Sequence, residues 1–216
     1  MENFDELALT WDNEPRRLER ANTIGNEIIK AIPDLDNMNA LEYGCGTGLL
    51  SFYLQPYLKS VTLCDNSQGM LNVLSEKIKA AGINNMMPKL MDLTEVTDIN
   101  DKYDIIYTLL ALHHIDNIDM VINAFYRMLN QSGYICIADL DEEDGSFHGD
   151  EYVPHNGFNQ KYLKEKLERK GFVNINSSVC YMNKKKLKDG TEREYPIFLM
   201  TAKNLSAKEG YKISET

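Results

Sequence analysis

Three glycines alternate with other residues at Gly44, Gly46 and Gly48, directly after a short run that ends in Glu42 and Tyr43. Glycine has no Cβ, so the backbone at such a turn can approach a ligand closely and present its N–H groups at the start of a following helix. A strand, a glycine loop and a helix in this order are typical of a nucleotide-binding site. Ordinary tight turns are the alternative explanation of the glycines.

An acidic residue, Asp65, directly follows the second apolar run of this region, residues 61–64. In a βαβ unit that binds adenosine, a carboxylate at the end of the second strand accepts hydrogen bonds from the ribose hydroxyls. The dinucleotide pattern GxGxxG would need its third glycine at position 49, where Leu49 stands. The spacing therefore favours an adenosine-containing ligand and disfavours a nicotinamide or flavin enzyme, which stays open as an alternative.

These motifs resemble those of the class I methyltransferases that use S-adenosylmethionine. The family's first motif is an acidic residue followed by GxGxG, matched by Glu42 and the three glycines, and its second motif is the acid matched by Asp65. An acid after strand three meets the adenine in that family, and Asp92 stands there, with turn capping as its alternative role. The resemblance covers residues 28–203 and implies S-adenosyl-L-methionine as the cofactor. The implied cofactor-binding residues are Glu42, Gly44, Cys45, Gly46, Gly48, Asp65, Asn66, Met70, Asp92, Leu93 and Leu109.

All four histidines lie in two short segments that follow the predicted fourth and fifth core strands. Ligands bind at the carboxyl ends of parallel strands, so the two segments should meet in space. Imidazole titrates near neutral pH and can take a proton from a methyl acceptor. We therefore predict His113, His114 and His148 as catalytic residues, with Asp139 and His155 on the substrate side. Packed, capping or simply exposed histidines are the alternative.

A metal ion held by these histidines and the neighbouring acids is the less favoured interpretation, because no HxxxH or HxH spacing supports it, and no metal is predicted. The segment 139–158 is too long for a simple turn, and we expect it to fold over the acceptor. Its sequence, like that of residues 10–16, is similar to a small-molecule branch of bacterial methyltransferases. Trp11 and Arg16 are accordingly expected in an N-terminal lid, with a hydrophobic staple as the alternative for Trp11.

The elements that must position these residues follow from an alternation of short apolar runs with helical stretches. This alternation predicts repeated βαβ units, a mainly parallel sheet and helices on both of its faces. The resemblance implies a seven-stranded Rossmann-like α/β fold with strand order 3-2-1-4-5-7-6 and strand seven antiparallel. Strands are expected at 40–43, 60–64, 86–91, 103–108, 134–138, 172–183 and 194–203. Helices are expected at 13–31, 48–57, 67–81, 117–129 and 159–170.

The predicted domain organisation is an N-terminal lid and helix over residues 1–35, one cofactor-binding domain over 36–203, and a disordered tail over 204–216. A formal net charge of −10 argues against a nucleic-acid substrate, which requires a basic face. No apolar run approaches the roughly 20 residues of a membrane helix. The four cysteines form no CxxC pair, so free thiols in a reducing cytosol are expected. We expect a cytoplasmic monomer or homodimer with no membrane partner.

The predicted function is transfer of a methyl group from S-adenosylmethionine to an oxygen, nitrogen or sulfur atom of a small molecule. Methyltransferases that act on base nitrogens or amides carry an Asn/Asp-Pro-Pro-Tyr/Phe string after strand four, and residues 108–111 read Thr-Leu-Leu-Ala. Most of the rate is expected from in-line positioning and exclusion of water, with a histidine as general base. A noncatalytic protein that binds the same cofactor as a regulator or partner subunit is the alternative from another class.

Overall fold

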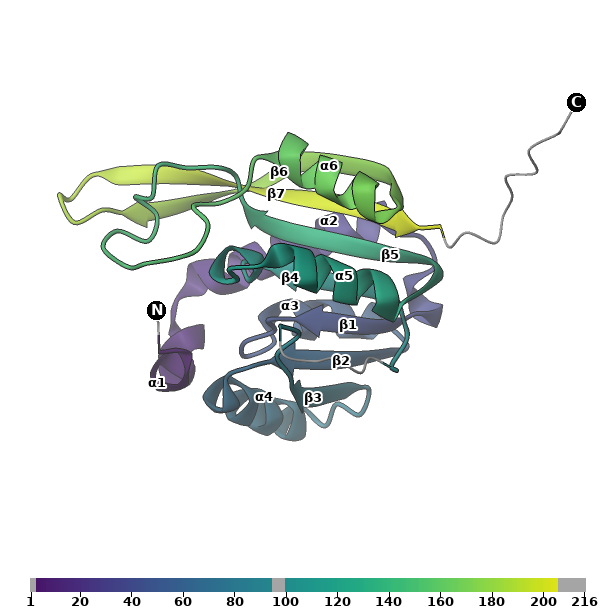
Figure 1. The fold of residues 1–216 in the computed structure, drawn as a ribbon. Helices are drawn as coiled ribbons and strands as arrows, with labels where there is room; N and C mark the ends of the chain where they lie inside the picture. The colour runs from purple at the N-terminus through teal and green to yellow at the C-terminus, as the bar shows by residue number, and fades with distance from the viewer. Residues whose placement is uncertain (1–2, 95–99, 206–216) are drawn as a thin grey trace, which may run out of the picture.

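A seven-stranded sheet of order β3-β2-β1-β4-β5-β7-β6 runs through the computed structural model, which describes residues 3–94 and 100–205 (Figure 1). Strands β1 to β5 are parallel to one another, and β7 is antiparallel to both of its neighbours. This arrangement confirms the predicted fold and strand order. The strands are β1 Asn39–Tyr43, β2 Ser60–Asp65, β3 Met86–Leu90, β4 Tyr103–Leu109, β5 Leu129–Leu140, β6 Phe172–Lys186 and β7 Glu192–Asn204.

The longer helices lie close to the predicted ranges and begin at side chains that cap them. Ser67, Asn117 and Asn159 each accept a hydrogen bond from a backbone N–H in the first turn of the helix that follows. The α-helices are α1 Phe4–Leu7, α2 Pro15–Ala31, α3 Leu49–Leu54, α4 Gln68–Ala81, α5 Ile118–Met128 and α6 Gln160–Lys170. The 3₁₀ turns are η1 Ala8–Asn13, η2 Leu35–Asn37, η3 Gln55–Tyr57 and η4 Leu112–His114.

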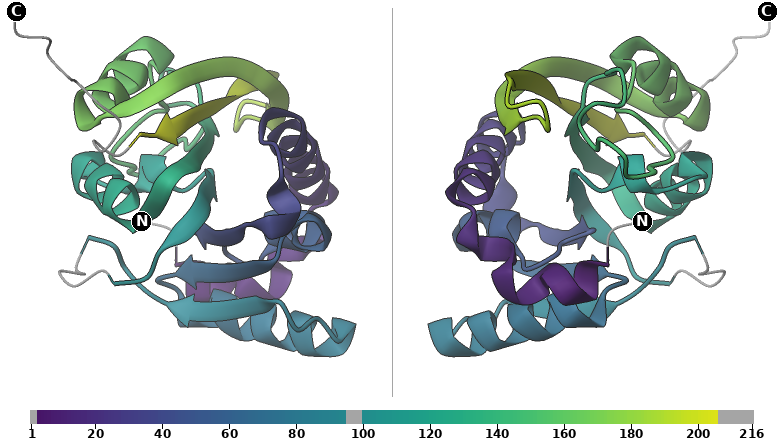
Figure 2. Two further views of the ribbon diagram at one scale, coloured as in Figure 1. Left: turned by 90° about the vertical axis from the view of Figure 1, so that its right-hand side faces the viewer. Right: turned by 90° about the vertical axis from the view of Figure 1, so that its left-hand side faces the viewer.

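Two hydrophobic cores form, one on each face of the sheet (Figure 2). Helices α2, α3 and α4 cover one face with fully buried side chains such as Ile24, Leu50 and Leu74. Helices α5 and α6 cover the other face, where Phe125 and Leu167 are fully buried. The central strands are therefore apolar toward both sides, which is why they read as continuous apolar runs in the sequence.

The structure differs from the sequence-based ranges at β5 and in the N-terminal segment. Strand β5 begins at Leu129 rather than at 134, because Leu129 pairs with Tyr103 across a register shift and Ser132 adopts a φ of 63°. The short helix α1 and the turn η1 were not predicted. Helix α1 has no side-chain cap and too few residues to be stable alone, so its position depends on contacts with the rest of the chain.

The last two strands form the predicted antiparallel hairpin, closed by a hydrogen bond from Leu187 N to Thr191 O. Its tip extends beyond the sheet beside the segment that follows β5 (Figure 1), where Arg193 binds Asp144. All four cysteines are free, as predicted. Among the described residues, no helix is long and apolar enough to cross a bilayer. The predicted tail lies outside the described residues from position 206 onward.

Candidate functional site

The three glycines of the loop after β1 all adopt positive φ values, 68°, 52° and 81° along the chain. A Cβ on Gly44 would lie 2.4 Å from Cβ of Ala111, and a Cβ on Gly48 would lie 2.5 Å from Cδ1 of Leu74. A Cβ on Gly46 would meet no described protein atom closer than 3.9 Å. Close packing within the protein therefore explains the glycines at positions 44 and 48, whereas the space beside Gly46 is open to a ligand.

The room at Gly46 lies between the loop, helix α4 and the N-terminal segment. The nearest atoms to a Cβ there would be Sδ of Met70 and Nε1 of Trp11, each at 3.9 Å. Met70 is buried in the first turn of α4. Its contact with a cofactor stays a prediction. A side chain on Gly46 would narrow this space, which is the condition expected of a loop that holds a ligand.

Asp65 ends β2 next to the glycine loop, as predicted. Its Oδ2 accepts a hydrogen bond of 2.7 Å from the backbone N–H of Gly46, and its Oδ1 accepts one of 2.9 Å from the N–H of Ser67. Burial raises the pKa of Asp65, while these backbone N–H groups act in the opposite direction. The carboxylate is thus fixed beside the loop, where it could accept further hydrogen bonds from a hydroxylated ligand.

A hollow of about 390 Å³ is lined by Asn66, which follows Asp65 in the chain, and by Leu90, Met91 and Asp92. Asp92 accepts hydrogen bonds from the N–H and the hydroxyl of Thr94, so it caps the turn after β3 in addition to facing the hollow. The turn-capping alternative for Asp92 and its predicted ligand role are thus compatible. Leu93 is buried in the core that α5 covers, and Leu109 is the last residue of β4.

Glu42 lies beneath the loop in a buried polar network. Its Oε2 accepts a hydrogen bond from the Ser51 hydroxyl, whose oxygen is also 2.6 Å from the hydroxyl of Tyr107. Burial raises the pKa of Glu42 to about 8, so this side chain carries a proton at neutral pH. Glu42 therefore links β1 to α3 and β4, and its contact with a cofactor stays a prediction.

Cys45 contributes to the same loop through its backbone. Its N–H donates to the carbonyl of Cys64, which ties the loop to the end of β2. The side chain is buried, and burial raises the pKa of the Cys45 thiol. This thiol is therefore a packing group, and the backbone of Cys45 is what could face a ligand.

The N-terminal segment lies along α4 and the glycine loop (Figure 2, right view). Its Asp5 carboxylate accepts hydrogen bonds of 2.6 Å from the Ser67 hydroxyl and 2.7 Å from the Gly69 N–H. Asp12 forms an ion pair with Lys77 of α4. Two carboxylates thus hold this segment beside the glycine loop and α4. Sequence reasoning missed Asp5, because only the folded chain brings it to the start of α4.

Trp11 lies in the segment so anchored, in the position expected of a lid residue. The Arg17 guanidinium stacks on its ring at 3.6 Å from the centroid, and Phe4 meets it edge-on. Arg16, in contrast, is not brought to the site. It donates to the carbonyl of Lys184 in the β6–β7 hairpin, because α2 packs against β6 and presents Arg16 to that hairpin.

Three of the four histidines meet at the carboxyl ends of β4 and β5. The ring centroids of His113 and His114 are 4.1 Å apart, and that of His148 lies 5.0 Å and 5.5 Å from theirs. Burial is the main cause that lowers the pKa of His114 to about 3 and that of His148 to about 4, so both are neutral at pH 7. The sequence-based expectation that the two segments meet is confirmed, and we call these three residues the histidine cluster.

Asp139, the penultimate residue of β5, orients the first histidine of the cluster. Nδ1 of His113 donates to its Oδ1 at 2.6 Å, and the Leu112 and Leu140 N–H groups donate to the same carboxylate. Both Asp139 and His113 are buried. This bond leaves Nε2 of His113 as the nitrogen with a free lone pair.

His155 lies outside the histidine cluster. Its Nε2 donates to the carbonyl of Ile115 at 3.0 Å, and its backbone N–H donates to the carbonyl of His113. It therefore fastens the segment after β5 to the segment after β4. Its substrate role stays a prediction beside this structural contact.

Comparison with known proteins shows which family this geometry resembles. Residues 40–133 match the family model described as a methyltransferase domain. The match includes the glycine loop, Asp65, the residues that line the hollow and the first two members of the histidine cluster. This similarity agrees with the resemblance of the sequence motifs to class I S-adenosylmethionine-dependent methyltransferases.

Relatives of known sequence agree with this assignment. An uncharacterized methyltransferase of Schizosaccharomyces pombe is 32% identical over 123 residues, which are 52% of this chain and 42% of that protein. A ubiquinone biosynthesis O-methyltransferase of Hydrogenovibrio crunogenus is 25% identical over 152 residues, 68% of this chain and 62% of that protein. The match to this chain thus spans less than two thirds of the length of either relative.

Solved structures share the fold of this chain at low sequence identity. Phosphoethanolamine N-methyltransferase 2 of Haemonchus contortus, in complex with S-adenosyl-L-methionine, matches with a TM-score of 0.71 and 13% identity over 95% of this chain and 60% of that one. The YcgJ protein of Bacillus subtilis matches with a TM-score of 0.68 and 14% identity over 85% of this chain and 98% of that one. These similarities support the fold alone.

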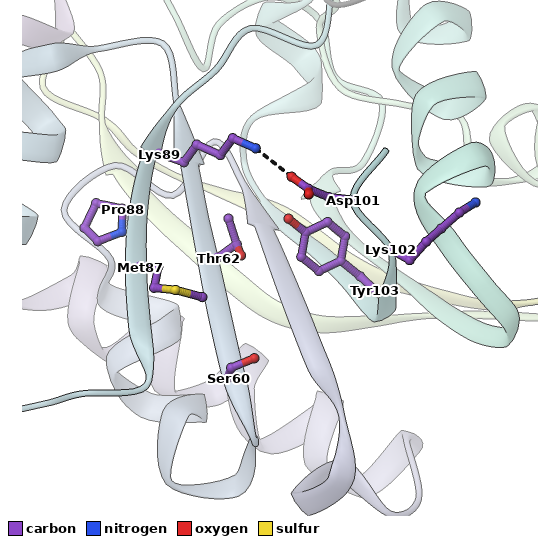
Figure 3. A pocket seen from close by; sticks show the side chains of 8 residues that line it. All are labelled: Ser60, Thr62, Met87, Pro88, Lys89, Asp101, Lys102 and Tyr103. Atoms are coloured by element: carbon purple, nitrogen blue, oxygen red, sulfur yellow. Dashed lines mark hydrogen bonds and ion pairs between the residues drawn. The ribbon is translucent and has the colours of Figure 1, made fainter. Parts of the chain in front are cut away.

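A second hollow, about 380 Å³ in volume, lies between β2, β3 and the start of β4 (Figure 3). An ion pair between Lys89 and Asp101 crosses it at 2.7 Å. None of the predicted site residues lines this hollow. The candidate site is therefore the edge formed by the glycine loop, Asp65 and the histidine cluster.

Proposed function

We propose that the chain binds S-adenosylmethionine and transfers its methyl group to an oxygen, nitrogen or sulfur atom of a small molecule. The observation that carries this proposal is the placement of Asp65 and the open glycine, Gly46, at the same sheet edge as the buried pair of His113 and Asp139. Asp65 and Gly46 suit the binding of a nucleoside. His113 and Asp139 suit the transfer of a proton. Their common location on the carboxyl side of the sheet is where such folds bind ligands.

The residues present fit the cofactor. Asp65 would accept hydrogen bonds from the ribose, the hollow that Asn66 and Asp92 line would receive the adenine, and the backbone at Gly46 would face the amino-acid part. The absence of a Cβ at Gly46, with no described atom within 3.9 Å of where it would be, supports this fit. When bound, the cofactor supplies a methyl group on a positively charged sulfur, ready for in-line displacement.

The histidine cluster is proposed to serve the acceptor. His113 is the member best suited as general base, because Asp139 holds its ring and leaves Nε2 free to take a proton. His114 and His148, with pKa values near 3 and 4, are weaker bases at neutral pH. We propose that these two residues determine the shape and polarity of the acceptor pocket.

Two observations support a small acceptor. The N-terminal segment is anchored to the start of α4 and to Lys77 by Asp5 and Asp12, beside the glycine loop, where it would hinder the approach of a polymer. Two of the relatives carry names of small-molecule enzymes, a ubiquinone biosynthesis O-methyltransferase and a demethylmenaquinone methyltransferase. Hydroxylated aromatic compounds are accordingly the first acceptors to assay.

Titration calorimetry with S-adenosylmethionine, S-adenosylhomocysteine and NAD tests the cofactor. We expect binding of the first two alone, and we expect Asp65→Ala to weaken it by at least tenfold, about 1.4 kcal/mol. Asp101→Ala, in the hollow of Figure 3, is the control and should bind as the parent does. Equal affinity of the Asp65 variant and the parent would refute the cofactor site.

Turnover with a panel of phenols, amines and thiols then separates an enzyme from a binder. Formation of S-adenosylhomocysteine that requires an acceptor and fails in His113→Gln would support methyl transfer with a histidine base. Cofactor binding without turnover on any acceptor class would instead favour the noncatalytic alternative.

A further inference from the structure

We propose that the histidine cluster, His113, His114 and His148, binds a divalent transition-metal ion, with zinc as the representative. The inference goes beyond methyl transfer and does not depend on it, because metal binding can be measured without cofactor or acceptor. Three observations support it: the spacing of the ring nitrogens, the carboxylate behind one ring, and an unpaired buried nitrogen.

The spacing is close to that of a metal site. One nitrogen from each of the three rings can be chosen so that all lie within 4.8 Å of one another. Zinc holds imidazole nitrogens at 2.0–2.1 Å in tetrahedral directions, which puts bonded nitrogens about 3.4 Å apart. Ring rotations that move the nitrogens inward by roughly 1 Å would therefore complete the coordination.

Asp139 supplies the support that metal-binding histidines usually have. A ligating histidine commonly donates its second N–H to a carboxylate, which fixes the tautomer and the ring orientation. Nδ1 of His113 donates to Asp139 in this way at 2.6 Å, and both residues are buried. The Nε2 lone pair of His113 is thereby available to a metal ion.

His148 provides independent support for a ligand bound at the cluster. Its Nδ1 is buried, yet it has no hydrogen-bond partner within the described part of the chain. A buried nitrogen without a partner is unfavourable and calls for an explanation such as an ion or a water molecule. A metal ion between the rings would satisfy the cluster as a whole.

The type of ligand indicates which metals the histidine cluster would favour. Imidazoles without thiolates favour zinc, copper, nickel or cobalt over magnesium or calcium. Three protein ligands leave one tetrahedral position for water or another small ligand.

Metal binding and the general-base role of His113 exclude each other, because a nitrogen that holds a metal cannot accept a proton. The turnover proposed above therefore belongs to the metal-free protein. A zinc ion on the histidine cluster would suppress that turnover, and a chelator would restore it.

Cobalt and zinc titrations of the chelator-treated full chain test the proposal. We expect one Co²⁺ per chain with the visible absorption of a tetrahedral site, displaced by one equivalent of Zn²⁺. His148→Ala and His114→Ala, which change partly exposed residues, should each weaken Zn²⁺ binding at least tenfold. His155→Gln is the control: it changes a histidine outside the cluster and should leave the Zn²⁺ affinity unchanged.

The same variants distinguish this proposal from the cofactor site. His148→Ala should bind S-adenosylmethionine as the parent does, which also shows that it is folded. Absence of stoichiometric Co²⁺ and Zn²⁺ binding, or equal Zn²⁺ affinity in the parent and in both cluster variants, would overturn the metal site whatever the outcome for methyl transfer.

Discussion

Oδ1 of Asp139 lies 2.6 Å from Nδ1 of His113, and both side chains are removed from solvent. The carboxylate comes from the end of β5 and the imidazole from the turn η4 after β4, so the sheet itself sets their separation. A buried carboxylate that accepts an imidazole N–H stabilises the protonated ring when a proton arrives at Nε2. The contact between Asp139 and His113 therefore determines whether the histidine cluster can accept a proton at Nε2 of His113.

Replacing Asp139 with asparagine should lower kcat by at least 100-fold in metal-free protein. Asparagine keeps the shape but can present an N–H to His113, which favours the wrong tautomer, and general-base catalysis is worth about 10²–10⁴ in rate. Steady-state kinetics with saturating cofactor measures the effect. The affinity for S-adenosylmethionine should stay within about twofold of the parent, and an unchanged kcat would contradict the base assignment.

Gly46→Ala should weaken cofactor binding at least tenfold, since the added methyl group would occupy the space that faces Met70 and Trp11. Gly82→Ala is a matched control. Gly82 has a similar positive φ of 65°, and a Cβ there would meet no described atom within 4 Å. Each variant should lose about 1 kcal/mol of unfolding free energy from the strained backbone, measured by urea unfolding. Equal cofactor affinity in the two variants would remove Gly46 from the site.

Glu42→Gln should make stability less dependent on pH. The pKa of Glu42 is raised in the folded protein to about 8 from 4.5, so the folded state binds more protons between these values. Its contribution to stability is therefore full below pH 4.5 and is lost as the pH rises through 8. Glutamine mimics the protonated acid and should hold its stability from pH 6 to 9. The prediction would be contradicted if the free energies of unfolding of the parent and the variant changed in parallel with pH over this range.

Asp5→Asn should loosen the N-terminal segment. The Ser67 hydroxyl and the Gly69 N–H hold the pKa of the Asp5 carboxyl below its usual range, which shows that they favour its charged form. Hydrogen exchange of residues 4–13 should become faster in the variant, whereas exchange in β1 and β4 should not change. Glu6→Gln is the control: the Glu6 carboxylate accepts a side-chain hydrogen bond only from Asn3, which precedes α1, among the described residues. Unchanged exchange in Asp5→Asn would show that the segment is held by other contacts.

Much of the fold was predictable because its signals are local. The alternation of apolar runs with amphipathic helices gave the strands and the longer helices, and the glycine loop with Asp65 indicated an adenosine ligand. These features depend on backbone freedom, on side-chain periodicity and on the order of elements along the chain. The meeting of the two histidine segments followed from the same parallel topology.

What the sequence could not provide was the partner of each side chain. Tertiary structure alone put Asp5 at the start of α4, sent Arg16 to the hairpin and bound His155 to the carbonyl of Ile115. Histidines at 113, 114 and 148 have no regular spacing, so their closeness depends on how the segment after β5 folds back. A pattern along one chain reports which face or end of an element a residue occupies. Distances between side chains from remote elements arise only when packing fixes all of those elements together.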